Sequence, residues 1–359
     1  MKGPRVMWNT IPYLFMALII NFAIFSGFSF TFNIQQTGLY YMVLLLVSFS
    51  HPVSLVLLTR SSNLLVRTLY AVSAAWTGMV AYILIMFAVY LILGFFINIP
   101  AYTAGIVILL VAFVVTVYAI INVTRLKVEE ITIPLNIENN IRAVQISDVH
   151  IGPIRKQGFL RRMMDKIIDL NPDIVFITGD LFDGSSKLED NILKDFKRIK
   201  APILFVMGNH DFYQGRDQVS DFVSGTPINI LYNEVLDLQD LQVVGVPFSW
   251  DRHYLQKTLP KINFDRDKPT ILLYHLPSEF KVAKAAGIDL QLSGHTHAGQ
   301  FFPFNYFVRL PFPYIRGLYG DEGGYLYVSQ GTGTLGPPMR LGSRCEITLI
   351  KLVGGKSIS

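Results

Sequence analysis

The sequence predicts two parts of different fold class: a region of four transmembrane helices, followed by an α/β domain. Residues 1–128 contain no Asp or Glu and six of the chain's 31 Lys and Arg residues, whereas the rest carries the other 25 basic residues and all 26 acidic ones. In that second part, short apolar runs alternate with amphipathic stretches, the pattern of strands and helices in an α/β domain. A length of 359 residues also favours about two domains.

Four apolar stretches fill the first part, at about 11–31, 39–59, 69–96 and 102–123. Each is long enough for an α-helix, which rises about 1.5 Å per residue, to cross the roughly 30 Å hydrocarbon core of a bilayer. The third is longer than needed and would tilt or extend beyond the core. The first is too long for the apolar part of a secretory signal and lacks an Ala-x-Ala-like cleavage site, so we interpret it as an uncleaved helix.

The basic residues of this part alternate between loops and predict its orientation. The loops at 31–38 and 97–101 carry no charge, whereas the other flanking segments are basic and contain Lys2, Arg5, Arg60, Arg67, Arg125 and Lys127. Positive residues favour the cytoplasmic side, so the N-terminus and the second part are predicted to lie in the cytoplasm, on a multi-pass protein of the inner membrane. The net charge of +5 comes from these residues, so it does not indicate a nucleic-acid partner. A single cysteine, Cys345, fits a reducing compartment.

One titratable side chain inside the apolar stretches, His51, has two interpretations. An intramembrane histidine can mark a path for protons or ions. It can also be a neutral, hydrogen-bonded side chain at a helix kink, and Pro52 directly follows it. We favour the second interpretation, because the stretches contain no acidic partner and resemble an anchor more than a transporter.

The second part divides into a linker and first strand (124–139), a domain (140–353) and a short tail (354–359). Strands alternate with helices at first and become shorter later. The strands are expected at 141–147, 174–178, 203–207, 228–232, 241–246, 270–274, 290–293, 325–329 and 345–352. Helices are expected near 156–170, 188–199 and 278–286. The first strands should be parallel, so that their carboxyl ends meet at one edge of a sheet.

Five groups of polar residues follow these apolar runs within about 150 residues. They are Asp148-Val-His150, Gly179-Asp180, Gly208-Asn209-His210-Asp211, His275 and Gly294-His295-Thr296-His297. Asp, Asn and His supply the oxygen and imidazole donors that a pair of divalent metal ions requires. A lone Asp-x-His is weak, but five such groups at strand ends predict a dinuclear metal hydrolase.

With these motifs, residues 140–350 resemble the calcineurin-like metallophosphoesterase superfamily. A Gly-His-Thr-His-x-Gly-Gln motif and a Gly/Pro/Arg-rich tail at 329–344 resemble, more narrowly, its membrane-anchored bacterial branch. The resemblance implies a two-sheet β-sandwich flanked by helices, and His210 beside the scissile phosphate, where it protonates the leaving group or stabilises its charge. It also implies two metal sites that share Asp180: one formed by Asp148, His150 and His297, the other by Asn209, His275 and His295.

This ligand set predicts a metal-dependent phosphoric ester hydrolase. A hydroxide that bridges two metal ions would attack phosphorus in line, and mixed nitrogen and oxygen donors suit Mn, Fe or Zn. The expected substrate contains a phosphodiester or pyrophosphate bond and is lipid-linked, for example UDP-2,3-diacylglucosamine in lipid A biosynthesis. Two alternatives stay open: a phosphoesterase for a soluble phosphoester, and a non-catalytic membrane protein that binds metal.

Several further residues have two interpretations each. Asp183 and Asp211 either orient a neighbouring ligand or cap a helix or loop. The segment 301–316 is rich in aromatic residues and proline; it either touches the bilayer or substrate, with Arg309 or Arg316 facing phosphate, or packs against the sandwich, which we favour. Arg340 and Arg344 contact phosphate or form ion pairs in the tail.

Overall fold

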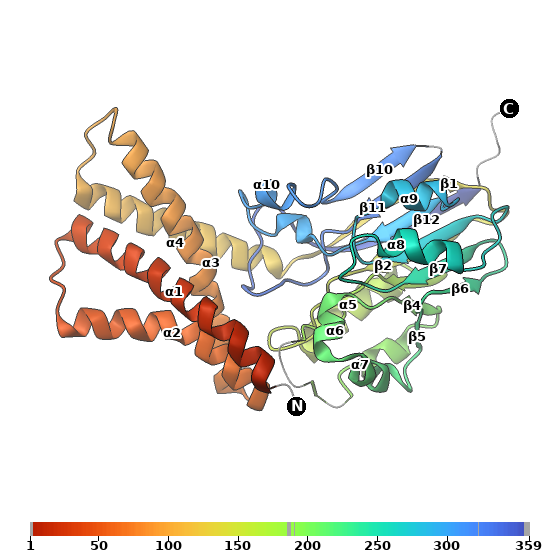
Figure 1. Ribbon diagram of the computed structural model, residues 1–359, viewed down its shortest axis with the longest axis horizontal. Coiled ribbons are helices and arrows are strands. Elements are labelled where there is room, and N and C mark those ends of the chain that lie inside the picture. Colours follow the sequence, from red (N-terminus) through yellow and green to blue (C-terminus); the bar gives the residue numbers. More distant parts are fainter. Residues whose placement is uncertain (1–2, 185–187, 190, 322, 355–359) are drawn as a thin grey trace. The chain divides into compact units, whose positions relative to one another are not determined.

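The computed structural model describes residues 3–184, 188–189, 191–321 and 323–354 (Figure 1). The chain divides into two compact units. One comprises the residues up to Asn122 together with Gly336–Met339, and the other comprises most of the remaining chain, from Val123 onward. The prediction of four apolar helices followed by an α/β domain is confirmed. The domain boundaries given above remain predictions.

Four long helices form the first unit: α1 (Gly3–Phe32), α2 (Gly38–Arg60), α3 (Leu64–Leu93) and α4 (Ala101–Val123). Each is long and apolar enough to cross a bilayer. Side chains define two of the starts, because Thr37 caps α2 and Asn63 caps α3 by accepting from the N–H of Val66 at 2.9 Å. The cap at Asn63 explains why α3 begins at Leu64, five residues before the start of the apolar stretch expected at 69–96.

His51 lies inside the helical unit with polar partners. Its Nδ1 is 3.2 Å from Ser73 Oγ, which in turn is 3.3 Å from Ser54 Oγ. The ring packs near Tyr70 and Tyr13, with centroids 5.3 and 5.8 Å away. These contacts agree with the hydrogen-bonded interpretation of this histidine, which stays a prediction.

The second unit contains two six-stranded mixed sheets. The first sheet has the order β1 (Leu126–Leu135), β12 (Cys345–Gly354), β2 (Ile141–Ile146), β3 (Ile174–Ile177), β4 (Ile203–Phe205) and β5 (Ile228–Ile230). The second has the order β10 (Gly317–Asp321), β11 (Gly324–Val328), β9 (Leu290–Ser293), β8 (Thr270–Tyr274), β7 (Gln242–Val246) and β6 (Glu234–Asp237).

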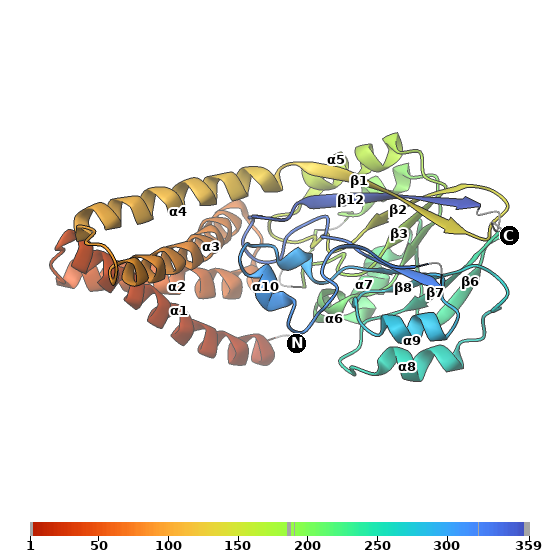
Figure 2. The ribbon, with the colours of Figure 1, turned by 90° about the horizontal axis from the view of Figure 1, so that it is seen from above.

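The two sheets pack face to face over a buried apolar layer that includes Phe176 and Ile350 from one sheet and Ile271 and Leu292 from the other. Helices cover the outer faces. Against the first sheet lie α5 (Gln157–Asp169) and α7 (Arg216–Val223), and against the second lie α8 (Tyr254–Thr258) and α9 (Phe280–Ala285). The predicted two-sheet sandwich flanked by helices is therefore confirmed (Figure 2).

The direction of the strands brings the ligand loops to one edge. In the first sheet β2, β3 and β4 run parallel, and in the second β7, β8 and β9 do. Their carboxyl ends therefore point the same way within each sheet, where open α/β folds bind ligands. Because β12 is antiparallel to β2 and parallel to β1, the starting ends of β12 and β1 lie at this same edge of the first sheet.

Candidate metal centre

The loops after the strands hold the predicted ligands in an unusual backbone conformation. Asp148, His150, Asp180, His295 and His297 all have positive φ, between 50° and 70°. This left-handed region is uncommon for residues other than glycine, and such strain concentrates at functional sites. The loops also approach one another closely: a Cβ on Gly294 would lie 2.0 Å from Ser147 Oγ, so a larger residue has no room there.

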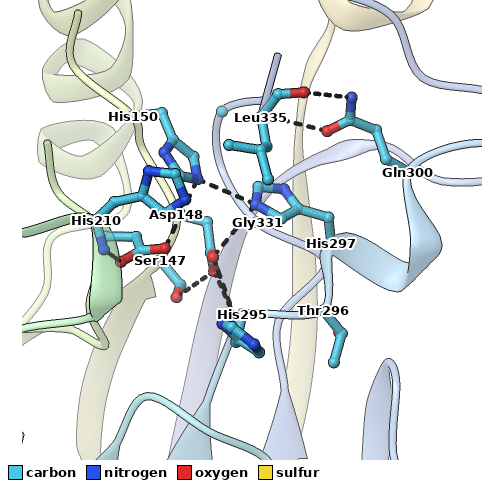
Figure 3. Close-up of polar contacts among 12 residues, drawn as sticks. Ser147, Asp148, His150, His210, His295, Thr296, His297, Gln300, Gly331 and Leu335 are labelled. Atoms are coloured by element: carbon cyan, nitrogen blue, oxygen red, sulfur yellow. Dashed lines mark hydrogen bonds and ion pairs between the residues drawn. The ribbon is translucent and has the colours of Figure 1, made fainter. Parts of the chain in front are cut away.

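Asp148, His150 and His297 form the first ligand group (Figure 3). The Nε2 atoms of His150 and His297 are 3.1 Å apart, and His297 Nε2 is 3.4 Å from Asp148 Oδ1. All three side chains are buried. Burial lowers the pKa of both histidines well below the ordinary value, so their nitrogens are neutral and able to bind a cation.

Asp180, His275 and His295 form the second group. His275 Nε2 lies 3.3 Å from Asp180 Oδ2 and 3.2 Å from His295 Nδ1. The other nitrogen of His275, Nδ1, is 2.8 Å from the carbonyl of Thr178 and donates to it, which directs Nε2 to the centre. Burial disfavours the charged form of His275, but the neighbouring Asp180 carboxylate raises its pKa to about 9.

Asp180 lies between the two groups. Its Oδ2 is 3.3 Å from His275 Nε2 in the second group and 3.9 Å from His150 Nε2 in the first. Its other oxygen accepts the N–H of His210 at 2.8 Å. A carboxylate with both ligand groups within this range has the position expected of a shared ligand.

Two buried polar atoms without a hydrogen-bond partner bear on whether metal ions fit this centre. Within the described residues, Asn209 Oδ1 and His150 Nδ1 are buried and have no hydrogen-bond partner. An unsatisfied buried oxygen is costly, and a cation would satisfy the one on Asn209. The imidazole nitrogens, two carboxylates and this amide oxygen are therefore donors that suit a pair of divalent ions.

Asp211 organises the backbone of two ligand loops. Its carboxylate is fully buried and accepts the N–H groups of Asp180, Phe182 and Gly208 at 2.8–2.9 Å. Burial and the Asp180 carboxylate raise its pKa to about 7. Its contact with Gly208 also lies at the start of α6 (Asn209–Gln214), so one side chain contacts two loops and the start of a helix.

His210 and Asp183 meet at the side of the centre. His210 Nδ1 is 2.7 Å from the carbonyl of Asp183 and donates to it, so Nε2 is the ring nitrogen that this carbonyl does not engage. The Asp183 carboxylate lies 3.8 Å from His150 Nδ1. The ring of His210 is half-buried and packs edge-on against His150 and Tyr213.

The four arginines have different positions. Arg340 is fully buried and donates to the carbonyls of Gly331, Gly333 and His297, while one of its nitrogens lies 3.1 Å from His297 Nδ1. The structure thus brings it behind a predicted metal ligand. Arg344 is on the surface, 4.0 Å from Glu129. Arg309 and Arg316 are exposed, and Arg316 donates to the carbonyl of Gly342.

The segment 301–316 has packed ends and an exposed middle. Phe312 packs edge-on against the ring of His295 at 5.1 Å, and the carbonyl of Ile315 accepts from Thr296 Oγ1. In contrast, Phe307 in α10 (Asn305–Val308) is 65% exposed and Leu310 is 81% exposed. The prediction that this segment packs against the sandwich therefore holds for its ends and not for its middle.

Sequence reasoning missed two groups that position ligands. Ser147 Oγ donates to Asp148 Oδ2 at 2.6 Å, and the Thr178 carbonyl sets the orientation of His275. The position of Ser147 directly before the ligand was a usable signal. A backbone carbonyl has no such signal, because every residue type carries one.

A sandwich with these clustered ligands defines a class, the metal-dependent phosphoester hydrolases. The family described as calcineurin-like phosphoesterase matches residues 141–299. An uncharacterized metallophosphoesterase of Campylobacter jejuni is 35% identical over 261 residues, 69% of each chain. One from Aquifex aeolicus is 31% identical over 68% of this chain and 98% of its own. A transmembrane protein with metallophosphoesterase domain from Danio rerio is 32% identical over 68% of this chain and 61% of its own.

The chain belongs to the calcineurin-like metallophosphoesterase family. The predicted family, fold class and enzyme class, metal-dependent phosphoester hydrolase, are thereby confirmed. The family depends on two metal ions, and the four apolar helices suggest a membrane protein. Part of the Campylobacter and Danio relatives lies outside the matched regions.

Proposed function

We propose that the protein is a membrane-anchored hydrolase that cleaves a phosphodiester or pyrophosphate bond with two divalent metal ions. The observation that carries this proposal is the position of Asp180 within 3.9 Å of histidines from both ligand groups. Asp148, His150 and His297 would hold one ion and Asn209, His275 and His295 the other. The mixed donors favour Mn, Fe or Zn.

The chain's own groups then have distinct tasks. When bound, the ions would supply Lewis-acid activation of water and neutralise charge on the phosphoryl group. Asp211 fixes the backbone of the loops around Asp180, and Thr178 orients His275. His210, with Nδ1 committed to the Asp183 carbonyl, presents Nε2 to hold or deliver a proton at the leaving oxygen.

The substrate that the membrane anchor favours is a lipid-linked phosphoester, such as UDP-2,3-diacylglucosamine. The four apolar helices support this choice, because they keep the domain beside a bilayer. The basic flanks support a cytoplasmic domain on the inner membrane. A periplasmic reporter fused after Ser359 should give no signal; a strong signal would reject the cytoplasmic assignment.

The activity is tested with detergent-purified, metal-stripped protein and a chromogenic phosphodiester. Adding Mn should restore hydrolysis in the wild type and not in Asp180→Asn. Removing residues 1–122 should abolish activity toward the lipid-linked substrate and preserve cleavage of the small diester. A truncated protein that cleaved the natural substrate as well as the full-length protein does would reject the lipid-linked substrate and favour a soluble one. A metal-loaded, folded protein that cleaves neither would favour a binding function.

A further inference from the structure

Four exposed apolar side chains lie close together in the chain, beside the candidate metal centre. Phe302, Tyr306, Phe307 and Leu310, which we name the apolar rim, are 50%, 59%, 65% and 81% exposed. The other exposed large hydrophobic residues described in the α/β unit are dispersed along the chain: Ile168, Tyr213, Trp250, Leu318 and Leu335. A local concentration of exposed apolar side chains marks an interaction surface more often than it marks ordinary surface.

The apolar rim is attached to a ligand loop on both sides. Before it, Gly299 belongs to the turn that contains His297, and a Cβ there would lie 2.4 Å from the Cα of Asn305 in α10. After it, Ile315 accepts from Thr296 Oγ1 at 2.7 Å, and Phe312 packs against His295. The rim is therefore held beside the loop that supplies two of the proposed metal ligands.

A short connection joins the last apolar helix to this edge of the domain. Leu126 at the start of β1 pairs with Cys345 at the start of β12, and β12 runs antiparallel to β2, whose carboxyl end leads to Asp148. In Figure 1 and Figure 2, α10 lies at the end of the α/β unit from which β12 starts. Since α4 ends at Val123, the chain between the apolar helix and this edge can extend at most roughly 11 Å.

We infer that the apolar rim binds the phospholipid leaflet from which α4 emerges and brings the metal centre to lipid phosphoesters in that leaflet. Aromatic side chains favour the membrane interface, and the exposed Arg309 and Arg316 complement anionic headgroups. The inference rests on the proposed membrane-anchored hydrolase and names its substrate class: a phosphoester whose acyl chains stay in the bilayer during cleavage.

Quenching by labelled lipids tests the rim in the full-length protein. Leu310→Cys and, independently, Phe307→Cys are labelled with bimane, which is selective because the native Cys345 is fully buried. The matched control is Asp267→Cys, an exposed site before β8, at the opposite end of the strand that leads to His275. Each protein is placed, one copy per disc, in nanodiscs of phosphatidylcholine and phosphatidylglycerol, with or without doxyl groups on the acyl chains.

Doxyl lipids should quench bimane at positions 310 and 307 several times more strongly than at position 267. Equal quenching at all three positions would overturn the inference. The inference would also be overturned if the bimane at position 310 were shielded from water but not quenched by doxyl lipids. The same holds if it were quenched only in discs that contain two copies of the protein, because protein and not lipid would then cover the rim. Hydrolysis of a chromogenic diester by the same samples reports on the proposed function separately: quenching without hydrolysis would reject the enzyme and keep the lipid surface.

Discussion

The two units use buried histidine in opposite ways. In the helical unit, His51 lies beside the hydroxyl of Ser73 and near the rings of two tyrosines. In the α/β unit, His150 and His297 direct nitrogens at one another across 3.1 Å, and burial keeps both neutral. Two imidazole nitrogens this close to each other can bind one cation together. All three histidines are buried, so burial alone does not identify a metal-binding histidine. The side chains next to it do.

The largest expected difference between the two units is the effect of Asp180→Asn on diester hydrolysis compared with that of His51→Gln. Loss of the carboxylate that we propose both metal ions share should reduce diester hydrolysis by on the order of a hundredfold or more. Even groups that only support a ligand are worth about ten- to a hundredfold. His51→Gln keeps a polar side chain near Ser73 and should leave hydrolysis unchanged. Steady-state rates at saturating Mn measure both. Comparable losses in the two variants would contradict the division of roles between the units.

Metal removal should destabilise the α/β unit selectively. Ions that bind the folded state at about a hundred times their dissociation constant contribute roughly 2.7 kcal/mol. Differential scanning calorimetry in detergent should show one transition that falls with chelator and recovers with Mn. Asp148→Asn replaces a proposed carboxylate ligand with a neutral amide, so its transition should respond less to Mn. A wild-type transition that ignores the chelator would argue against occupied metal sites.

Arg340→Lys, with Arg344→Lys as its control, tests the support behind His297. A lysine ammonium cannot reproduce the several N–H groups that Arg340 donates to the carbonyls of Gly331, Gly333 and His297. We expect metal affinity, measured by titrating stripped protein, to fall by about tenfold or more. Arg344 forms a surface ion pair, which contributes no more than about 1 kcal/mol, so its variant should bind metal normally. Unchanged affinity in Arg340→Lys would show that His297 needs no such support.

The comparison also explains what sequence reasoning could and could not predict. The four helices and the strand ends at Asp148, Asp180 and His275 follow from local hydropathy, and parallel strands bring such ends to one edge. The fold of the tail does not follow locally: Arg340 reaches His297 because β12 returns between β1 and β2. Exposure of Leu310 depends on tertiary packing in the same way, and local composition alone favoured a buried loop.

The smallest expected difference between the two units is the effect of Ser147→Ala on metal affinity compared with that of Ser48→Ala. Ser147 Oγ donates to Asp148 Oδ2 at 2.6 Å, whereas Ser48 Oγ donates to the Leu44 carbonyl of its own helix at 2.7 Å. Both hydroxyls are buried, and Ser147 Oγ also lies 3.1 Å from the carbonyl of Thr178. A hydrogen bond of this kind is worth about 1 kcal/mol. Only the first holds a ligand, so only Ser147→Ala should weaken metal binding, by roughly tenfold. Equal metal affinities in a titration of the two variants would mean that Asp148 is oriented by its loop alone, through the N–H of His295 that donates to both of its oxygens.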